Sequence, residues 1–292
     1  MLDLKLRRSM LFMPGNNPGM LQTAPIFGAD SVILDLEDAV AITEKDSARI
    51  LIREALKSND YEGVEVVIRI NPMSTPFAHD DIDAMARLKP DAILLPKATP
   101  EDMKELDEML DRIEKEEGME PGTIKVHALV ETAYGVETVY ETIKVSSRCE
   151  AVLLGGEDLA ADLAVKRSKD SEELFYARTK IVNACKALKV ASVDTPFTDT
   201  NDYEGLRADT EKAKKLGFSG KLSINPRQID TIHEVYSPTE AEIHHARRVM
   251  YAKEEAEKEG LGVFSLDGKM VDLPIINRAQ HTLDVAKLIG LI

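Results

Sequence analysis

Charged residues gather at the ends of short apolar segments in this sequence of 292 residues. Glu131 ends one such segment, and Asp158 follows the next segment after a pair of glycines. Two carboxylates that reach one point, with water and substrate oxygens as the other ligands, are typical of a Mg²⁺ site. We therefore expect Glu131 and Asp158 to bind Mg²⁺. The alternative is structural, with Glu131 capping a loop and Asp158 capping the next helix.

Arg69 ends another apolar segment, where an unpaired guanidinium would be costly. Its planar fork suits two-point binding of a substrate carboxylate. An ion pair with Glu37 or Asp38 would explain the same position, and both interpretations hold if these acids orient the arginine. Lys97 has the same two interpretations, substrate binding or a structural ion pair. A third role, as a Schiff-base nucleophile, needs a lowered pKa that sequence does not reveal.

Gly155, Gly156 and Glu157 stand just before Asp158, between an apolar segment and a helical pattern. Paired glycines allow backbone N–H groups to approach an anion at the start of a helix. We expect a substrate carboxylate to bind there. The same residues are also typical of an ordinary turn.

Eight short apolar segments alternate with amphipathic stretches and predict the elements that position these residues. The segments are residues 8–13, 31–38, 64–71, 92–97, 125–132, 151–158, 191–196 and 221–226. They are apolar on both faces, which indicates buried parallel strands. Eight strand-helix units predict an α/β fold, the (β/α)8 TIM barrel. A doubly wound open sheet is the alternative, although no glycine fingerprint follows the first strand.

Helical spacing is clear in the intervening stretches. Thr99 and Pro100 are typical of a helix N-cap and first turn. Ile50, Leu51 and Ala55 are expected to share the buried face of an earlier helix.

Barrel enzymes build their sites at the C-terminal ends of the strands. The polar residues expected there are Asp35, Glu37, Asp38, Arg69, Asn71, Lys97, Glu131, Thr132, Glu157, Asp158, Asp194 and Asn225. The N-terminal ends show nothing comparable, so we expect one acidic pocket. Arg7 and Arg8 are expected at the barrel mouth, where they would meet phosphates of a thioester-bearing cofactor arm.

The last part of the chain exceeds what a barrel needs. Ser237 and Pro238 predict the start of a charged helix, Asp267-Gly268 predicts a tight hairpin, and residues 283–288 predict a closing helix. We expect a catalytic barrel domain over 1–227 and a helix-hairpin-helix extension over 228–292.

Composition excludes several classes of protein. Lys and Arg total 37 and Asp and Glu total 52, and the net charge of −15 repels nucleic acid. Cys149 and Cys185 lack the spacing of a disulfide framework or a zinc site. No segment reaches the ~18 apolar residues that span a bilayer, and no signal peptide is evident. We expect a cytoplasmic protein without membrane or nucleic-acid partners.

The motifs, taken together and in order, resemble the citryl thioester lyases of the HpcH/HpaI aldolase superfamily. They are RSMLFMPGN from Arg8, DLEDAV from Asp35, RIN from Arg69, LPK ending at Lys97, ET from Glu131, GGED from Gly155, DTP from Asp194, GKLSINPRQI from Gly220, and KMVD ending at Asp272. The resemblance covers nearly the whole chain. It implies a (β/α)8 barrel, Mg²⁺ at Glu131 and Asp158, and Arg69 on substrate oxygens.

The resemblance also implies a homo-oligomer, a trimer or a hexamer, in which the extension packs on a neighbouring subunit. Asp272 would then reach the neighbour's active site, although a turn residue at the end of a hairpin is the simpler interpretation. The implied protein partners are an acyl carrier protein subunit and an acyltransferase α subunit.

The implied reaction is retro-aldol cleavage of a citryl thioester into oxaloacetate and an acetyl thioester. Asp272 would protonate the departing enolate, and Glu37 or Asp38 would take the hydroxyl proton. Cleavage of malyl-CoA or citramalyl-CoA, a metal-dependent 2-oxo acid aldolase, and a non-catalytic assembly subunit are the alternatives.

Overall fold

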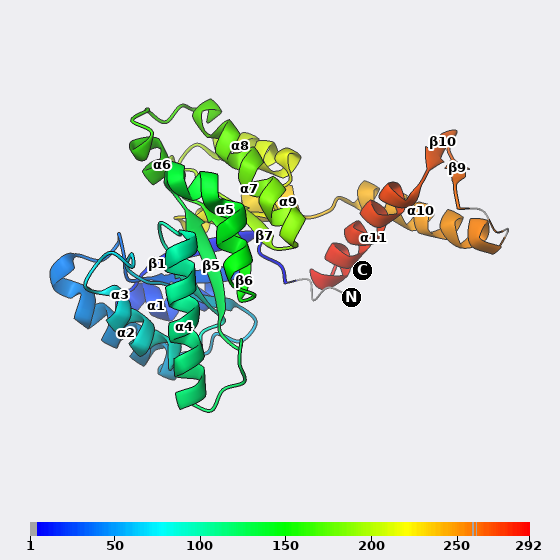
Figure 1. The fold of residues 1–292 in the computed structure, drawn as a ribbon. Coiled ribbons are helices and arrows are strands. Elements are labelled where there is room, and N and C mark those ends of the chain that lie inside the picture. Colours follow the sequence, from blue (N-terminus) through cyan, green and yellow to red (C-terminus); the bar gives the residue numbers. More distant parts are fainter. Residues whose placement is uncertain (1–4, 259, 261) are drawn as a thin grey trace. The chain divides into compact units, whose positions relative to one another are not determined.

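A computed structural model describes residues 5–292, apart from residues 259 and 261, so the first four residues of the expected barrel domain lie outside the described part. Eight parallel strands close into a barrel in chain order (Figure 1). They are β1 (Ser9–Pro14), β2 (Ser31–Asp35), β3 (Glu65–Arg69), β4 (Ala92–Leu95), β5 (Lys125–Val130), β6 (Cys149–Leu154), β7 (Ala191–Asp194) and β8 (Gly220–Ser223). The predicted (β/α)8 barrel is confirmed, and the open sheet is excluded because β1 pairs with β8.

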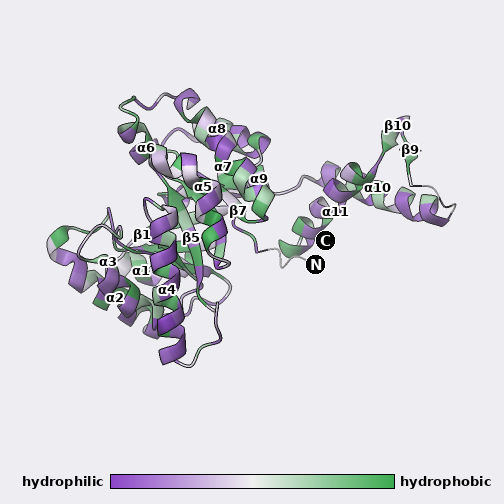
Figure 2. Ribbon diagram, in the orientation of Figure 1, coloured by the Kyte–Doolittle hydropathy of each residue, from purple (hydrophilic) through white to green (hydrophobic). Residues whose placement is uncertain are grey.

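Helices connect the strands and cover the outside of the barrel. They are α1 (Pro18–Thr23), α2 (Lys45–Ser58), α3 (Ala78–Ala86), α4 (Pro100–Glu116), α5 (Ala133–Val145), α6 (Gly156–Asp162), α7 (Phe175–Leu188), α8 (Tyr203–Leu216) and α9 (Ile229–Tyr236). The predicted cap of α4 is confirmed, since the Thr99 hydroxyl accepts a hydrogen bond from the Asp102 amide at 3.1 Å. Green and purple faces along these helices mark their amphipathic character (Figure 2).

The predicted buried face of α2 was partly wrong. Ile50 is 51% exposed, whereas Ala48 and Ile52 are fully buried and Ala55 nearly so. These three residues follow the helical spacing of four and three, and that stripe faces the barrel. Ile50 is two residues from Ala48 and two from Ile52, about 200° around the helix from each at 100° per residue, so it lies on the opposite, solvent-facing side.

The inward faces of three strands show the same order of polarity along the barrel axis. Side chains of a strand alternate between faces, so residues two apart point the same way. The inward triplets are Ser31-Ile33-Asp35 in β2, Glu65-Val67-Arg69 in β3, and His127-Leu129 in β5 with Glu131 directly after it. Ile33, Val67 and Leu129 belong to one buried cluster with apolar residues of other strands. An apolar layer therefore separates two polar ends.

The polar residues at the N-terminal ends of the strands were not predicted. Arg7 donates to Glu65 at 2.7 Å and to Glu150 at 2.7 Å, and the Ser31 hydroxyl donates to Glu65 at 2.6 Å. Burial raises the pKa of Glu65, but the bonds from Arg7 and the nearby His127 outweigh it and lower the pKa to about 2. Polar atoms of Glu65, His127 and Glu150 lie within 4.8 Å of one another. The guanidinium of Arg7 already supplies a positive charge to this cluster.

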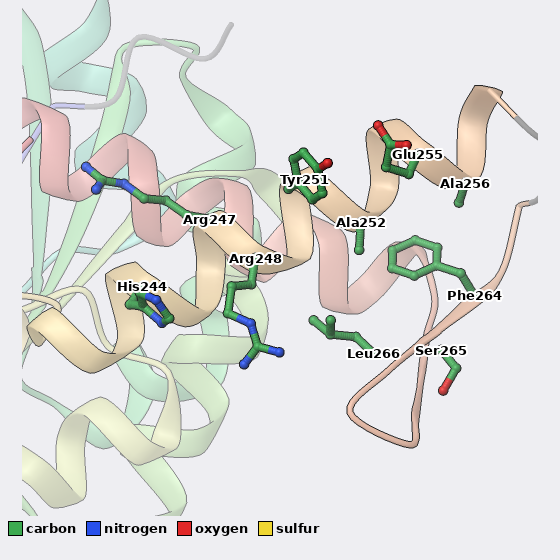
Figure 3. A pocket seen from close by; sticks show the side chains of 10 residues that line it. All are labelled: His244, Arg247, Arg248, Tyr251, Ala252, Glu255, Ala256, Phe264, Ser265 and Leu266. Atoms are coloured by element: carbon green, nitrogen blue, oxygen red, sulfur yellow. The ribbon is translucent and has the colours of Figure 1, made fainter.

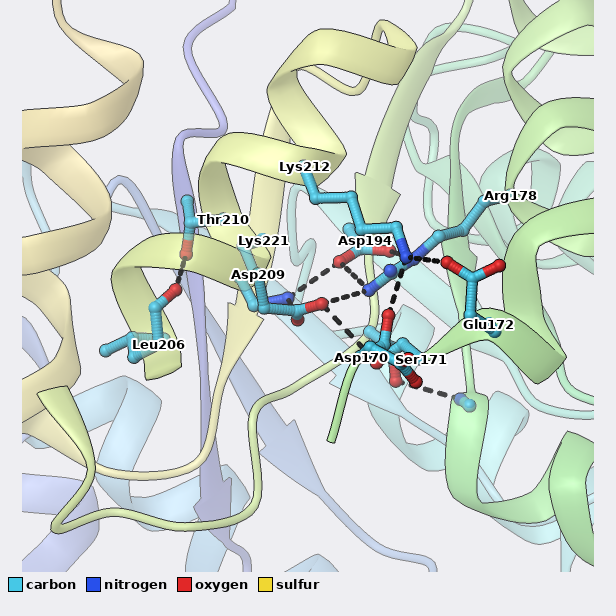
Figure 4. Close-up of polar contacts among 12 residues, drawn as sticks. Asp170, Ser171, Glu172, Arg178, Asp194, Leu206, Asp209, Thr210, Lys212 and Lys221 are labelled. Carbon is cyan, nitrogen blue, oxygen red and sulfur yellow. Dashed lines mark hydrogen bonds and ion pairs between the residues drawn. The ribbon is translucent and has the colours of Figure 1, made fainter. Parts of the chain in front are cut away.

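Asp194 does not face the expected pocket. Its neighbour Val193 belongs to the apolar layer inside the barrel, so Asp194 points outward toward the helices. Its carboxylate accepts bonds from Arg178 at 2.8 Å and from Lys221 at 2.7 Å (Figure 4). Asp209 of α8 completes the network by accepting from Lys221 at 2.6 Å. This buried network of two cations and two anions joins β7 and β8 to α7 and α8.

The described chain divides into two compact units, Arg7–His233 and Glu234–Ile292 with residues 5–6. The second unit holds α10 (Glu240–Lys258), β9 (Phe264–Leu266), β10 (Lys269–Val271) and α11 (Leu273–Leu288). Asp267 and Gly268 have φ angles of 52° and 74°, as the mirror-image turn of a tight hairpin requires. The predicted hairpin is confirmed, and the closing helix begins ten residues earlier than expected because Asp272 caps it.

A groove of ≈680 Å³ lies between α10 and the hairpin (Figure 3). Its lining includes Arg247, Tyr251, Phe264 and Leu266. It belongs entirely to the second unit. Among the described helices, none combines the length and the apolar character that crossing a bilayer requires.

Candidate active site

Arg69 lies at the centre of the polar residues at the C-terminal mouth of the barrel. Its Nε and Nη2 donate to the two Asp35 oxygens at 2.7 Å and 2.6 Å, and its Nη1 lies 2.9 Å from Glu37 Oε2. The predicted ion pair with Glu37 is therefore present, and Asp38 lies farther away at 3.6 Å. Of the five N–H donors of a guanidinium, two donate to Asp35, whereas the contact with Glu37 Oε2 is an ion pair only, because that buried oxygen accepts no hydrogen bond within the described residues. Asp35 leaves the other three donors of the guanidinium unused.

Burial and charge fix the ionisation of this group. Arg69 is 7% exposed, and its guanidinium stands 4.7 Å from the centre of the Phe12 ring. Burial lowers the pKa of Arg69, but the bonds and charges of Asp35 and Glu37 outweigh it and raise that pKa. Burial raises the pKa of Glu37 despite the nearby Arg69. The site thus holds a permanent cation beside a carboxyl group that binds a proton more readily than usual.

Glu131 is the second buried acid of the mouth, at 3% exposure. Burial, followed by repulsion from Asp158 and Glu37, raises the pKa of Glu131 to about 8, although Arg69 acts in the opposite direction. The Lys97 amide donates to Glu131 Oε1 at 2.9 Å. Lys97 has a φ of 49°, an uncommon conformation for lysine, which this bond helps to hold. Glu131 therefore also performs the loop-capping role that was its alternative interpretation.

Gly155 leaves space for Glu131. A Cβ atom at position 155 would lie 2.6 Å from Glu131 Oε2 and 2.6 Å from its Cβ, closer than real contacts allow. Asp158 follows in the first turn of α6, partly exposed. The metal ligands offered here are thus the carboxylates of Glu131 and Asp158, which repel each other. Glu131 is buried, and Gly155 beside it has no side chain. Carboxylates in such an arrangement fit a hard divalent cation, which relieves the repulsion.

The expected anion site at Gly155 and Gly156 is not formed by their amides. The Gly155 amide donates to the Val130 carbonyl at 3.0 Å, and the Gly156 amide donates to the Thr195 hydroxyl at 2.9 Å. Glu157 is exposed, and its carboxylate pairs with Arg167 at 2.9 Å. The two glycine amides and the Glu157 carboxylate thus have partners within the chain, and substrate binding at these three residues stays a prediction.

Arg8 was also misplaced by the sequence prediction. It precedes β1, so it lies at the N-terminal end of the barrel, opposite the mouth. Its guanidinium pairs with Asp30 at 2.7 Å, just before β2. A phosphate at the mouth cannot be reached from there, and Arg7 is buried against Glu65 at the same end.

The remaining predicted residues occupy different surroundings. Lys97 has a side chain 44% exposed, with Nζ 3.9 Å from Glu37 Oε1, so it stands at the rim of the mouth. The Asp272 side chain accepts from the Ile275 amide at 3.4 Å as the N-cap of α11, in the second unit. Its expected reach into a neighbouring subunit stays a prediction.

The sequence analysis missed the residues that support the mouth from behind. Lys45 donates to the carbonyls of Leu36 and Glu37, and Asn71 also donates to the Leu36 carbonyl. Phe12 beneath Arg69 was missed as well. Strand alternation could have placed Phe12 inside the barrel, because Phe12 lies two residues after the inward-facing Met10.

Comparison with known proteins identifies the family to which this site belongs. Residues 8–226 match the family described as HpcH/HpaI aldolase/citrate lyase. The chain belongs to this family. The match covers all eight strands and all of the mouth residues described above.

Individual relatives span almost the whole chain. The citrate lyase subunit beta of Leuconostoc mesenteroides subsp. cremoris is 47% identical, over 97% of this chain and 94% of the relative. The mitochondrial citramalyl-CoA lyase of Rattus norvegicus is 32% identical, over 96% and 86%. The crystal structure of CitE from Mycobacterium tuberculosis in complex with magnesium, acetoacetate and coenzyme A has a TM-score of 0.79 at 30% identity, over 97% and 98%. The chain described here is therefore a carbon–carbon lyase of the HpcH/HpaI family.

Proposed function

We propose that the chain cleaves a citryl thioester, carried by an acyl carrier protein or by coenzyme A, into oxaloacetate and an acetyl thioester. The observation that carries the proposal is the pairing of a fixed arginine with a carboxylate pair in one barrel mouth. The 47% identity to a citrate lyase subunit beta favours citryl among the thioesters that this family accepts. Citramalyl-CoA or malyl-CoA is the second candidate, favoured by the relative that is a citramalyl-CoA lyase.

Glu131 and Asp158 would hold Mg²⁺. Their fit to such an ion rests on the buried Glu131 carboxylate, its repulsion by Asp158, and the space left at Gly155. When bound, the ion would stabilise negative charge that develops on substrate oxygens during cleavage. The residues of the chain then have to bind the acid, orient it and move its protons.

Arg69 would bind a carboxylate and the neighbouring hydroxyl oxygen of the substrate with N–H donors that Asp35 does not use. Because Asp35 fixes the plane of the guanidinium, these donors point in a fixed direction and need no reorganisation during reaction. Glu37 contacts the same guanidinium and is the better candidate to take the hydroxyl proton. Its pKa is raised by burial, whereas Asp38 is 62% exposed in its side chain.

The departing acetyl thioester leaves as an enolate that needs a proton. We propose that Asp272 of a neighbouring subunit supplies it, with the extension over 228–292 packed against that neighbour in a trimer or hexamer. The proposed protein partners are the acyl carrier protein and the acyltransferase α subunit of a citrate lyase complex. They follow from the beta-subunit relatives.

The decisive experiment measures oxaloacetate release from citryl-CoA by the purified chain, with Mg²⁺ or with EDTA. Citramalyl-CoA, malyl-CoA and a 4-hydroxy-2-oxo acid are run in parallel. We expect Mg²⁺-dependent release, fastest from the citryl thioester. A preference for citramalyl-CoA or malyl-CoA would replace the proposed substrate, and cleavage of the free 2-oxo acid alone would replace the thioester chemistry. The proposal fails if no substrate is cleaved in the presence of Mg²⁺.

A further inference from the structure

Lys45 occupies a position that is unfavourable for lysine on two counts. It is 6% exposed, although lysines are rarely buried without a partner. It is also the first residue of α2, where the helix dipole disfavours a positive charge. Burial lowers the pKa of Lys45, and the charges of Asp35 and Glu37 act in the opposite direction. The contacts of the Lys45 ammonium must offset the free-energy cost of burying this charge at a helix N-terminus.

The contacts of the ammonium group identify what it holds. Nζ donates to the Leu36 carbonyl at 2.7 Å and to the Glu37 carbonyl at 2.7 Å. The Asn71 side chain donates to the same Leu36 carbonyl at 3.0 Å. On the other side of this segment, the Leu36 amide donates to the Arg69 carbonyl at 2.9 Å. The backbone that carries Glu37 is therefore fixed from both directions.

The segment needs such support because it is not part of a regular element. β2 ends at Asp35, and α2 begins only at Lys45. The Glu37 carboxylate must nevertheless meet Arg69 Nη1 at 2.9 Å from this connection. The Leu36 carbonyl also accepts from Asn71 and the Glu37 carbonyl from the Val40 amide, so the particular contribution of the Lys45 ammonium is to bridge the two carbonyls and tie them to the start of α2.

We propose that Lys45 is a positioning residue, which holds the Leu36–Glu37 backbone so that the Glu37 carboxylate stays aimed at Arg69 and at the substrate. The inference deepens the proposed lyase function and rests on it for the role of Glu37. Lys45 itself touches no substrate. Its effect on the reaction passes through the orientation of Glu37.

The test compares Lys45→Met with Lys57→Met, the same substitution at a lysine of the same helix whose side chain is 59% exposed. We expect Lys45→Met to lower kcat for the preferred thioester at least about tenfold, as small misplacements of catalytic groups do. KM and the Mg²⁺-dependent rise in melting temperature should change far less. Lys45→Arg, which keeps a charged donor, should recover part of the loss. Lys57→Met should stay within about twofold of wild type.

A double-substitution cycle with Glu37→Gln separates positioning from general stability. If Lys45 acts through Glu37, adding Lys45→Met to Glu37→Gln should lower kcat by less than about twofold further. Equal losses in both backgrounds would overturn the proposal, as would a folded Lys45→Met variant with wild-type kcat. Lys45→Gln replaces Lys45→Met in the cycle if the methionine variant does not fold.

Hydrogen exchange of the amides of residues 36–40 gives a readout that needs no activity. We expect faster exchange there in Lys45→Met than in wild type, with unchanged exchange in the distant β7. If wild type cleaves no thioester, the proposed function fails, and this measurement alone decides on Lys45. Identical exchange in both proteins would then reject the positioning role.

Discussion

The carboxylate of Asp35 binds the guanidinium of Arg69 side-on, through two bonds of 2.7 Å and 2.6 Å. The pair joins neighbouring strands at the level where β2 and β3 end, since Asp35 and Arg69 are register partners. Asp35 also accepts from the amides of Glu37 and Ala39 at 2.8 Å and 3.1 Å. One buried carboxylate thus orients both the arginine and the start of the segment that carries Glu37.

Arg69→Lys should lower kcat/KM by about a hundredfold or more, because an ammonium cannot keep the side-on pair and also present fixed donors to the substrate. Steady-state kinetics with the preferred thioester measures the loss. Arg53→Lys, at an arginine of α2 whose side chain is 46% exposed, is the matched control and should behave as wild type. A fully active Arg69→Lys variant would show that a point charge is sufficient at this position.

Gly155→Ala should abolish the rise in melting temperature that Mg²⁺ produces, since the new methyl group would displace the Glu131 carboxylate. Thermal unfolding with Mg²⁺ and with EDTA measures this effect. Gly19→Ala is the control, because a Cβ there makes only an ordinary contact at 3.6 Å. Glu131→Ala and Asp158→Ala should abolish the rise as well. A metal effect that survives all three substitutions would place the ion elsewhere.

The stability of the metal-free protein should fall as the pH rises from about 5 toward 9. The pKa of Glu131 is about 8 in the folded protein, above its ordinary value of 4.5. The folded state therefore keeps a proton that the unfolded state loses, and this contribution to stability disappears as the pH passes 8. In EDTA, Glu131→Gln should show a weaker decline of melting temperature over this range. Parallel declines would mean that Glu131 ionises normally.

Lys221→Met should destabilise the protein by about 3–5 kcal/mol, because it leaves Asp194 and Asp209 with one buried cation instead of two (Figure 4). Urea unfolding monitored by circular dichroism measures the free energy. Lys215→Met, at a lysine whose side chain is 78% exposed, should cost less than about 1 kcal/mol. Adding Asp209→Asn to Lys221→Met should restore part of the loss, and no restoration would contradict the proposed charge balance.

The barrel could be predicted from sequence because its strands are apolar on both faces and its helices begin with strong caps such as Thr99. The mouth residues Arg69 and Glu131 were predicted for a related reason, since a charged residue at the end of an apolar strand has few structural explanations. The prediction was weaker wherever the direction of a side chain mattered. Asp194 ends a strand as Glu131 does, but strand alternation turns it toward the helices.

The errors at the N-terminal ends have a different cause. Glu65 and His127 were counted as ordinary members of apolar strands, because their partners are distant in sequence. Arg7 reaches Glu65 across 58 positions and Glu150 across 143. Such long-range pairing has no local pattern. The crosslink from Lys45 to the Leu36 carbonyl spans only nine positions, but its acceptor is a backbone oxygen, which residue type does not reveal. Assigning every second residue of each strand to the barrel interior would have identified the polar residues at both ends of the barrel.

The apolar layer formed by Ile33, Val67 and Leu129 lies between the polar side chains of the two rims of this barrel. Closure of the barrel and recognition of the substrate therefore depend on different side chains and can be altered independently. Substitutions around Arg69 can retune which acid is cleaved while the pairing of Arg7 with Glu65 keeps the scaffold closed. A family whose members cleave different thioesters on one framework is the outcome that such a division permits.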